Sequence, residues 1–249
     1  MLTEKIQRYG TFGTHDALKL VALLSMFADH LGAFIYPDDI WLRILGRLAA
    51  PIFFFLIGYS RSYRQHADLI IGAVVLVGLK FAFTHSLADL NILVSFILLR
   101  FFFAAADKYA LLAKYLPVVF VVLLLLPWKA SFYFMQFCVL GWLFALFGYT
   151  QKNADTHSRY VRMAMLVFAF LIWDIAHAQM MHLDTPENIL LAALMISCGA
   201  ALRRYRPHDV PLPAPLRRYA PALQWPARYS LWIYVAHLAA LQLATRTFV

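Results

Sequence analysis

An aspartate and a histidine stand side by side in an apolar stretch near the start of the chain. They are Asp29 and His30, within the sequence FADHLG at 27–32. A histidine can take up a proton near neutral pH, and a neighbouring carboxylate or arginine can orient it or stabilise its charge. Because an ionisable group inside an apolar helix is costly, the pair indicates a reaction site or a transport pathway.

The same stretch also holds Lys19, and other apolar stretches are interrupted in the same way by Arg47, Lys80, Arg100, Asp174, His177 and His237. A helical rise of about 1.5 Å per residue places seven ionisable groups in one depth band of a membrane. They are Asp29, His30, Arg47, Lys80, Asp174, His177 and His237. This convergence predicts a shared site, to which Lys80, Asp174 and His177 contribute substrate contacts.

Spacing also predicts which side chains can meet. Asp174 and His177 are three residues apart and share a helix face. Asp29 and His30 are adjacent, so their side chains diverge by about 100°, and we expect one to be held by a neighbouring helix, as by Arg47. An architectural reading stays open, since buried Asp–Arg pairs also hold helices together.

The composition is that of a membrane protein. Hydrophobic residues make up 63% and charged residues 14% of 249, and the mean hydropathy is +0.68. Apolar runs near 20 residues recur, each long enough to cross a bilayer as a helix. Cys138 and Cys198 fall within such runs and read as small buried hydrophobes. The net charge of +9 fits basic cytoplasmic loops, and no nucleic-acid-binding motif is present.

The predicted fold is all-α, a polytopic bundle of about nine transmembrane helices forming a single domain over 1–249. The predicted spans are 16–36, 40–60, 67–84, 90–106, 112–128, 131–149, 160–181, 187–202 and 228–247. The first span acts as an uncleaved insertion signal. Segment 203–227 is a basic, Pro-rich loop, suited to neither continuous helix nor strand, along the cytoplasmic leaflet.

Charge asymmetry predicts the orientation. With the N-terminus in the cytoplasm, 15 of the 22 basic residues lie on the inner side. They are Lys5, Arg8, Arg61, Arg64, Lys108, Lys114, Lys152, Arg159, Arg162, Arg203, Arg204, Arg206, Arg217, Arg218 and Arg228. The outer side has Arg43, Lys129 and Arg246, with Asp38, Asp39, Asp89, Asp184 and Glu187. The positive-inside rule then places the N-terminus inside and, for nine spans, the C-terminus outside.

Three stretches resemble the TraX family of bacterial membrane proteins. They are DALKLVALLSMFADHLG at 16–32, LRILGRLAAPIFFFLIGYS at 42–60 and SLWIYVAHLAAL at 230–241. The resemblance implies an acetyltransferase of the bacterial inner membrane, related to a wider superfamily of transmembrane acyltransferases. It implies acetyl-CoA as the donor and a conjugative pilin amine or a surface glycan as the acceptor.

By position in the family pattern, His30 is the catalytic histidine and Asp29 its support. Arg47 is a neighbouring family position, and His237 is a further catalytic candidate. Lys19 and Arg100 lie nearer the predicted cytoplasmic ends, where they either snorkel to the interface or contact the CoA diphosphate. No metal is expected.

Rival functions remain open from the residues alone. A proton-coupled transporter or flippase also places Asp, His and Arg in the membrane. Such proteins typically contain broken helices and inverted repeats. A metalloenzyme could draw ligands from His30, Asp174, His177, His182 and His237, but no known metal-binding spacing occurs. A non-catalytic assembly scaffold is the third rival, and it would tolerate loss of the buried histidine.

Overall fold

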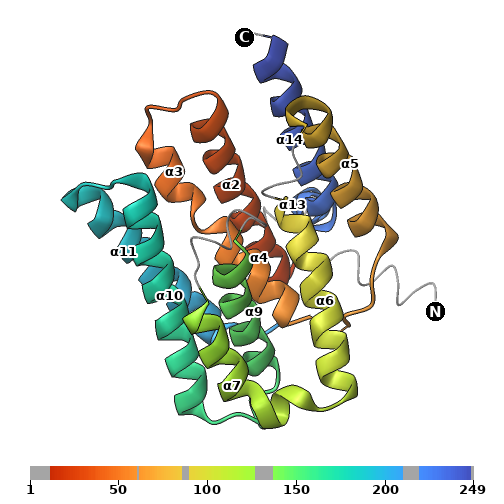
Figure 1. Ribbon diagram of the computed structural model, residues 1–249, viewed down its shortest axis with the longest axis vertical. Coiled ribbons are helices and arrows are strands. Elements are labelled where there is room, and N and C mark those ends of the chain that lie inside the picture. The colour runs from red at the N-terminus through yellow and green to blue at the C-terminus, as the bar shows by residue number, and fades with distance from the viewer. Residues whose placement is uncertain (1–11, 61, 86–89, 127–136, 210–218, 248–249) are drawn as a thin grey trace. The chain divides into compact units, whose positions relative to one another are not determined.

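The computed structural model describes residues 12–60, 62–85, 90–126, 137–209 and 219–247 (Figure 1). Within these ranges the chain is mainly helical, and Gly13 and Asp209 form an isolated antiparallel bridge. Several residues of the charge count lie outside the described residues: Lys5, Arg8, Arg61, Asp89, Lys129, Arg217 and Arg218.

The helices fall into two compact units. The first combines the two ends of the chain, 1–49 and 204–249. It holds α2 (Thr14–Phe34), α3 (Ile40–Gly46), α13 (Ala220–Arg228) and α14 (Ser230–Thr247). The second, 50–203, holds α4 (Ala49–Gly58), α5 (Ala67–Thr84), α6 (Ile92–Lys108), α7 (Leu111–Leu125), α9 (Cys138–Lys152), α10 (Arg159–Met181) and α11 (Thr185–Arg204).

In the first unit, α2 packs against α3, α13 and α14. Figure 1 shows α2 and α3 side by side, joined by a short turn. Near the start of α2, the Thr14 amide donates to the His208 carbonyl at 2.9 Å. This bond ties the N-terminal helix to the segment that follows α11, so distant parts of the sequence form one unit.

In the second unit, α9 packs against α6, α7 and α10. Glycines let α4 and α9 approach closely. A Cβ on Gly58 would lie 1.8 Å from the Ala145 carbonyl oxygen, and one on Gly148 would lie 2.2 Å from the Phe55 carbonyl oxygen. Small residues permit such close backbone packing between membrane helices.

The described helices overlap all nine predicted ranges, and 67–84 coincides with α5. Residues 127–128 and 131–136, in two of these ranges, lie outside the described residues. Among the described residues, five helical segments are long and apolar enough to cross a membrane: Thr14–Phe34, Ile40–Gly58 (α3 and α4 together), Ala67–Thr84, Arg159–Met181 and Thr185–Arg204. The count of nine and the orientation stay predictions.

The Pro-rich segment 203–227 is more helical than the sequence suggested. Its last residues form α13, which starts at Ala220 and carries Pro221 in its first turn. Proline is tolerated there because the first amides of a helix lack an intrahelical acceptor. The part at 210–218 lies outside the described residues.

Candidate functional site

Asp29 and His30 lie on α2 and engage different helices. The Asp29 carboxylate contacts arginines on the α3 side, whereas the His30 ring contacts α14. This divergence is the one predicted from their adjacency. The two residues therefore belong to two connected groups of side chains, here called the arginine cluster and the histidine pair.

The arginine cluster consists of Asp29, Arg43 and Arg47. Asp29 Oδ1 accepts a hydrogen bond from Arg47 Nη2 at 2.5 Å and forms an ion pair with Arg43 Nη1 at 3.0 Å. Arg43 Nη1 also donates to the Asp29 carbonyl at 3.0 Å, and Arg47 Nε donates to the Arg43 carbonyl at 3.1 Å. Arg47 is only 6% exposed. The predicted Asp29–Arg47 pairing is confirmed.

The cluster sits where the second predicted span is interrupted. α3 ends at Gly46 and α4 begins at Ala49, so the helix breaks at Arg47 and Leu48. Pro51 explains the break, because it has no amide hydrogen to donate to the carbonyl four residues earlier, at Arg47. Side chains satisfy carbonyls near the end of α3: Ser25 Oγ donates to Leu45 O at 2.5 Å, as membrane burial requires.

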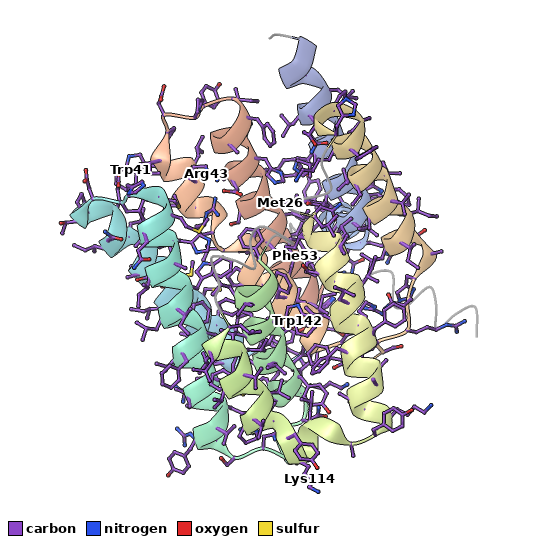
Figure 2. The ribbon with its side chains drawn as sticks, in the orientation of Figure 1. Met26, Trp41, Arg43, Phe53, Lys114 and Trp142 are labelled. Carbon is purple, nitrogen blue, oxygen red and sulfur yellow. The ribbon has the colours of Figure 1, made fainter. Side chains whose placement is uncertain are left out.

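Two glycines allow the close contact of α2 with α3. A Cβ on Gly46 would lie 2.3 Å from Asp29 Cβ and 2.6 Å from Asp29 Cα. Gly32 lies under the Arg43 stem, and a Cβ there would be 3.0 Å from Arg43 Cδ. Arg43 is labelled in Figure 2 on α3, where this helix runs beside α2.

The histidine pair consists of His30 on α2 and His237 on α14. His30 Nδ1 lies 2.5 Å from His237 Nε2, and the rings stack with centroids 4.8 Å apart. Both side chains are half-buried. Phe27 packs on His237 at 4.6 Å between centroids, and Tyr234 lies 6.1 Å from His30. Aromatic rings thus surround the two imidazoles.

Backbone contacts fix the tautomers of this pair in its neutral form. His237 Nδ1 lies 2.8 Å from the Ile233 carbonyl, which can only accept, so Nδ1 carries the hydrogen. Neutral His237 then has its lone pair on Nε2, and His30 must donate from Nδ1. The remaining lone pair lies on His30 Nε2, which is the atom available to take up a proton.

Lys19 is half-buried on α2, 11 residues before His30. Eleven residues correspond to about three turns, so the two side chains lie within about 20° of one face and about 16 Å apart along the axis.

Arg100 belongs to the second unit, on α6, and holds a loop. Its Nη2 donates to the Ser62 carbonyl at 3.0 Å and also to the Arg64 carbonyl. Next to it, the Tyr63 hydroxyl donates to Gly58 O at 2.6 Å, and burial raises the pKa of this phenol above its usual range. The contacts among the described residues are thus those of a loop anchor.

The second unit also holds Asp174 and His177 on α10 and Lys80 on α5. His177 is fully buried, its Nδ1 donates to Trp173 O at 2.8 Å, and its ring lies 4.2 Å from the Trp173 ring. Asp174 Oδ1 has no hydrogen-bond partner within the described part of the chain. The proposed role of these three residues in substrate binding stays a prediction.

Arg43 and Tyr234 are site residues that the sequence did not predict. Arg43 was assigned to the outer flank of a span, but it lies one turn before Arg47 on the same helix face. The i, i+4 spacing of the two arginines was the available signal.

Across the ranges that the structure describes, no group of three or more His, Cys, Asp or Glu side chains is placed to hold a metal.

Comparison with known proteins gives a family and a partial relative. No solved structure matches the chain. An uncharacterized protein of Rickettsia prowazekii (strain Madrid E) is 39% identical over 61 residues, which is 24% of this chain and 25% of that relative's length. The family model described as TraX protein matches residues 14–245, which include both the arginine cluster and the histidine pair. The chain therefore belongs to the TraX family.

Proposed function

We propose that this protein is an acyltransferase of the bacterial inner membrane, which moves an acetyl group from acetyl-CoA to an amine or hydroxyl acceptor. The observation that carries the proposal is the histidine pair, whose backbone-fixed tautomers leave a lone pair on His30 Nε2. The association of the TraX family with pilin acetylation supports the reaction class. A pilin N-terminal amine and a surface glycan are the proposed acceptors.

The proposed reaction uses His30 as general base. His30 Nε2 removes a proton from the acceptor, whose nitrogen or oxygen attacks the thioester carbonyl. The new C–N or C–O bond forms, the C–S bond breaks, and the CoA thiolate takes the proton back from His30. His237 Nε2 accepts the hydrogen bond from His30 Nδ1 throughout and stabilises the imidazolium that forms.

Arg47 is the proposed source of electrostatic stabilisation. It is buried, pairs with Asp29, and therefore stands one residue from the base. Positive charge held in a water-poor site favours the negative charge that develops on the thioester oxygen. Asp29 acts in this proposal by holding the arginines and does not contact the His30 ring.

The proposed donor site runs along α2 from Lys19 to His30. The ammonium of Lys19 would contact the CoA diphosphate. The pantetheine arm, of comparable length to the separation of about 16 Å, would bring the thioester to His30. Arg100 stays a second candidate for a phosphate contact, through the guanidinium atoms that do not hold the loop.

The test is transfer of label from radiolabelled acetyl-CoA to extracted envelope components by purified protein in nanodiscs. We expect His30→Ala to lower transfer by about 10²- to 10⁴-fold, the usual contribution of a general base. His66→Ala serves as the control, because His66 is exposed and lies outside the site. Equal transfer by wild type and His30→Ala would refute the role of His30, and no transfer by wild type would refute the function.

One observation favours transport as the second candidate. The span Ile40–Gly58 is broken at Arg47 and Leu48, beside buried charges, and broken helices are typical of secondary transporters. Proton-coupled flux into vesicles in the absence of any acyl-CoA would favour this alternative. Transfer of label without any proton-coupled flux would favour the acyltransferase.

A further inference from the structure

The arginine cluster holds more positive than negative charge. Two guanidinium groups, Arg43 and Arg47, share a single carboxylate oxygen of Asp29. In the described part of the chain, no second carboxylate forms an ion pair with either arginine. An uncompensated charge beside a buried pair is costly, so a ligand that supplies a negative charge would bind favourably.

Arg43 also presents unused donors with a defined geometry. Among the described residues, its Nη1 atom donates to the Asp29 carbonyl and forms the ion pair with Asp29 Oδ1. The opposite edge, Nε and Nη2, is the edge that binds a carboxylate or phosphate through two parallel hydrogen bonds. The side chain is 29% exposed, and its stem lies over Gly32, so Arg43 is both held in place and reachable by a ligand.

The anion could come from either substrate of the proposed reaction. Lys19, the proposed diphosphate contact, precedes Asp29 by ten residues, which is about 15 Å along α2. A CoA molecule with its diphosphate at Lys19 and its thioester at His30 has no phosphate beside Arg43. If the donor occupies this path, the acceptor must reach His30 from the other direction. Arg43 bonds the carbonyl of the residue directly before His30.

We propose that Arg43 binds an anionic group, a carboxylate or a phosphate, carried by the acceptor close to its reacting amine or hydroxyl. This inference rests on the proposed acyltransferase function and narrows its acceptor class. Acidic sugars and phosphorylated surface components fit this class, and a peptide amine fits only with an acidic residue near it.

The experiment uses the full-length protein in nanodiscs, radiolabelled acetyl-CoA and an envelope extract. The labelled product is fractionated by anion exchange, and kinetics are measured for wild type, Arg43→Gln, Arg43→Lys and the control Arg159→Gln. Arg159 is exposed at the start of α10, outside the site. Glutamine removes the charge, and lysine keeps the charge but loses the paired donors.

We expect an anionic labelled acceptor. Arg43→Gln should raise the KM for the acceptor fraction by about 10- to 100-fold, with the KM for acetyl-CoA unchanged. The KM of Arg43→Lys for the acceptor fraction should lie between the values of wild type and Arg43→Gln. The KM of Arg159→Gln should equal that of wild type. A neutral or cationic acceptor, or a raised KM for acetyl-CoA alone, would overturn the proposal.

A separate binding measurement distinguishes the two proposals. Thermal stabilisation by inorganic phosphate is compared with chloride at constant ionic strength. If wild type transfers no label, the proposed function fails. Phosphate stabilisation that is lost in Arg43→Gln then still supports an anion site at Arg43. Equal stabilisation of both proteins would overturn that site.

Discussion

At the scale of single residues, Asp29 and His30 show how two neighbours serve different partners. Their types and adjacency predicted a buried polar site and the Asp29–Arg47 pair. The contact between His30 and His237 was not predictable as a distance, because 207 residues separate them in sequence. Arg43 was hidden for another reason: a charge near a span end reads as a flanking residue until the break in the helix is known.

The histidine pair leads to a prediction about His237, which acts through His30 and is a positioning residue. His237→Ala removes the acceptor of the His30 Nδ1 hydrogen, so the lone pair is no longer fixed on Nε2. We expect kcat to fall about 100-fold, with little change in the KM for acetyl-CoA. His237→Gln, whose amide oxygen can accept the same bond, should recover part of the loss. Equal kcat in the alanine and glutamine variants would contradict the positioning role.

At the scale of helices, apolar runs and their flanking polar residues predicted most elements closely. Asn91 illustrates the reason, since its side chain accepts the Leu93 amide at 2.9 Å and starts α6. The break at Arg47 and Leu48 was not predicted, although Pro51 carried the signal. Hydropathy continues through the break, so a pattern that records only polarity predicts one continuous span at 40–60.

Gly46 supplies the prediction at this scale. Gly46→Ala places a Cβ against Asp29 backbone and side-chain atoms, so α3 must move away from α2 and the arginine cluster must open. We expect a loss of about 1–3 kcal/mol of stability, seen as a lower Tm in detergent, together with loss of acyl transfer.

The matched control is Gly78→Ala on α5. A Cβ at Gly78 meets nothing within 4 Å. The same substitution there should leave stability unchanged or raise it by up to about 1 kcal/mol through helix propensity. A Gly46→Ala protein as stable and active as the Gly78→Ala protein would show that close packing of α2 on α3 is not needed.

At the scale of the whole molecule, the candidate site draws on both ends of the chain. α2 and α3 supply the arginine cluster, and α14 supplies His237. Hydropathy along a chain predicts spans one by one, and it carries no information on which spans pack together. The two-unit division of the contacts was therefore out of reach of the sequence, even though the helices themselves were not.

The last prediction concerns the orientation of the chain in the membrane, which follows from charge asymmetry. With 15 of 22 basic residues on one side, we expect Ser158, between α9 and α10, to face the cytoplasm and Asp184, between α10 and α11, to face the opposite side. In a background with Cys138→Ala and Cys198→Ala, a membrane-impermeant maleimide should label Asp184→Cys in spheroplasts. It should label Ser158→Cys only after permeabilisation.

The same test extends to the C-terminus and so to the number of spans. α13 has nine residues, about 14 Å, and is too short to cross a bilayer core of about 30 Å, so α14 decides the side of the last residue. If nine spans cross the membrane, a cysteine added after Val249 should be labelled in spheroplasts, as Asp184→Cys is. Labelling like that of Ser158→Cys would mean an even number of spans. Lys19 and His30 would keep their spacing on α2, so the proposed donor site depends on the orientation of α2 and not on the total count.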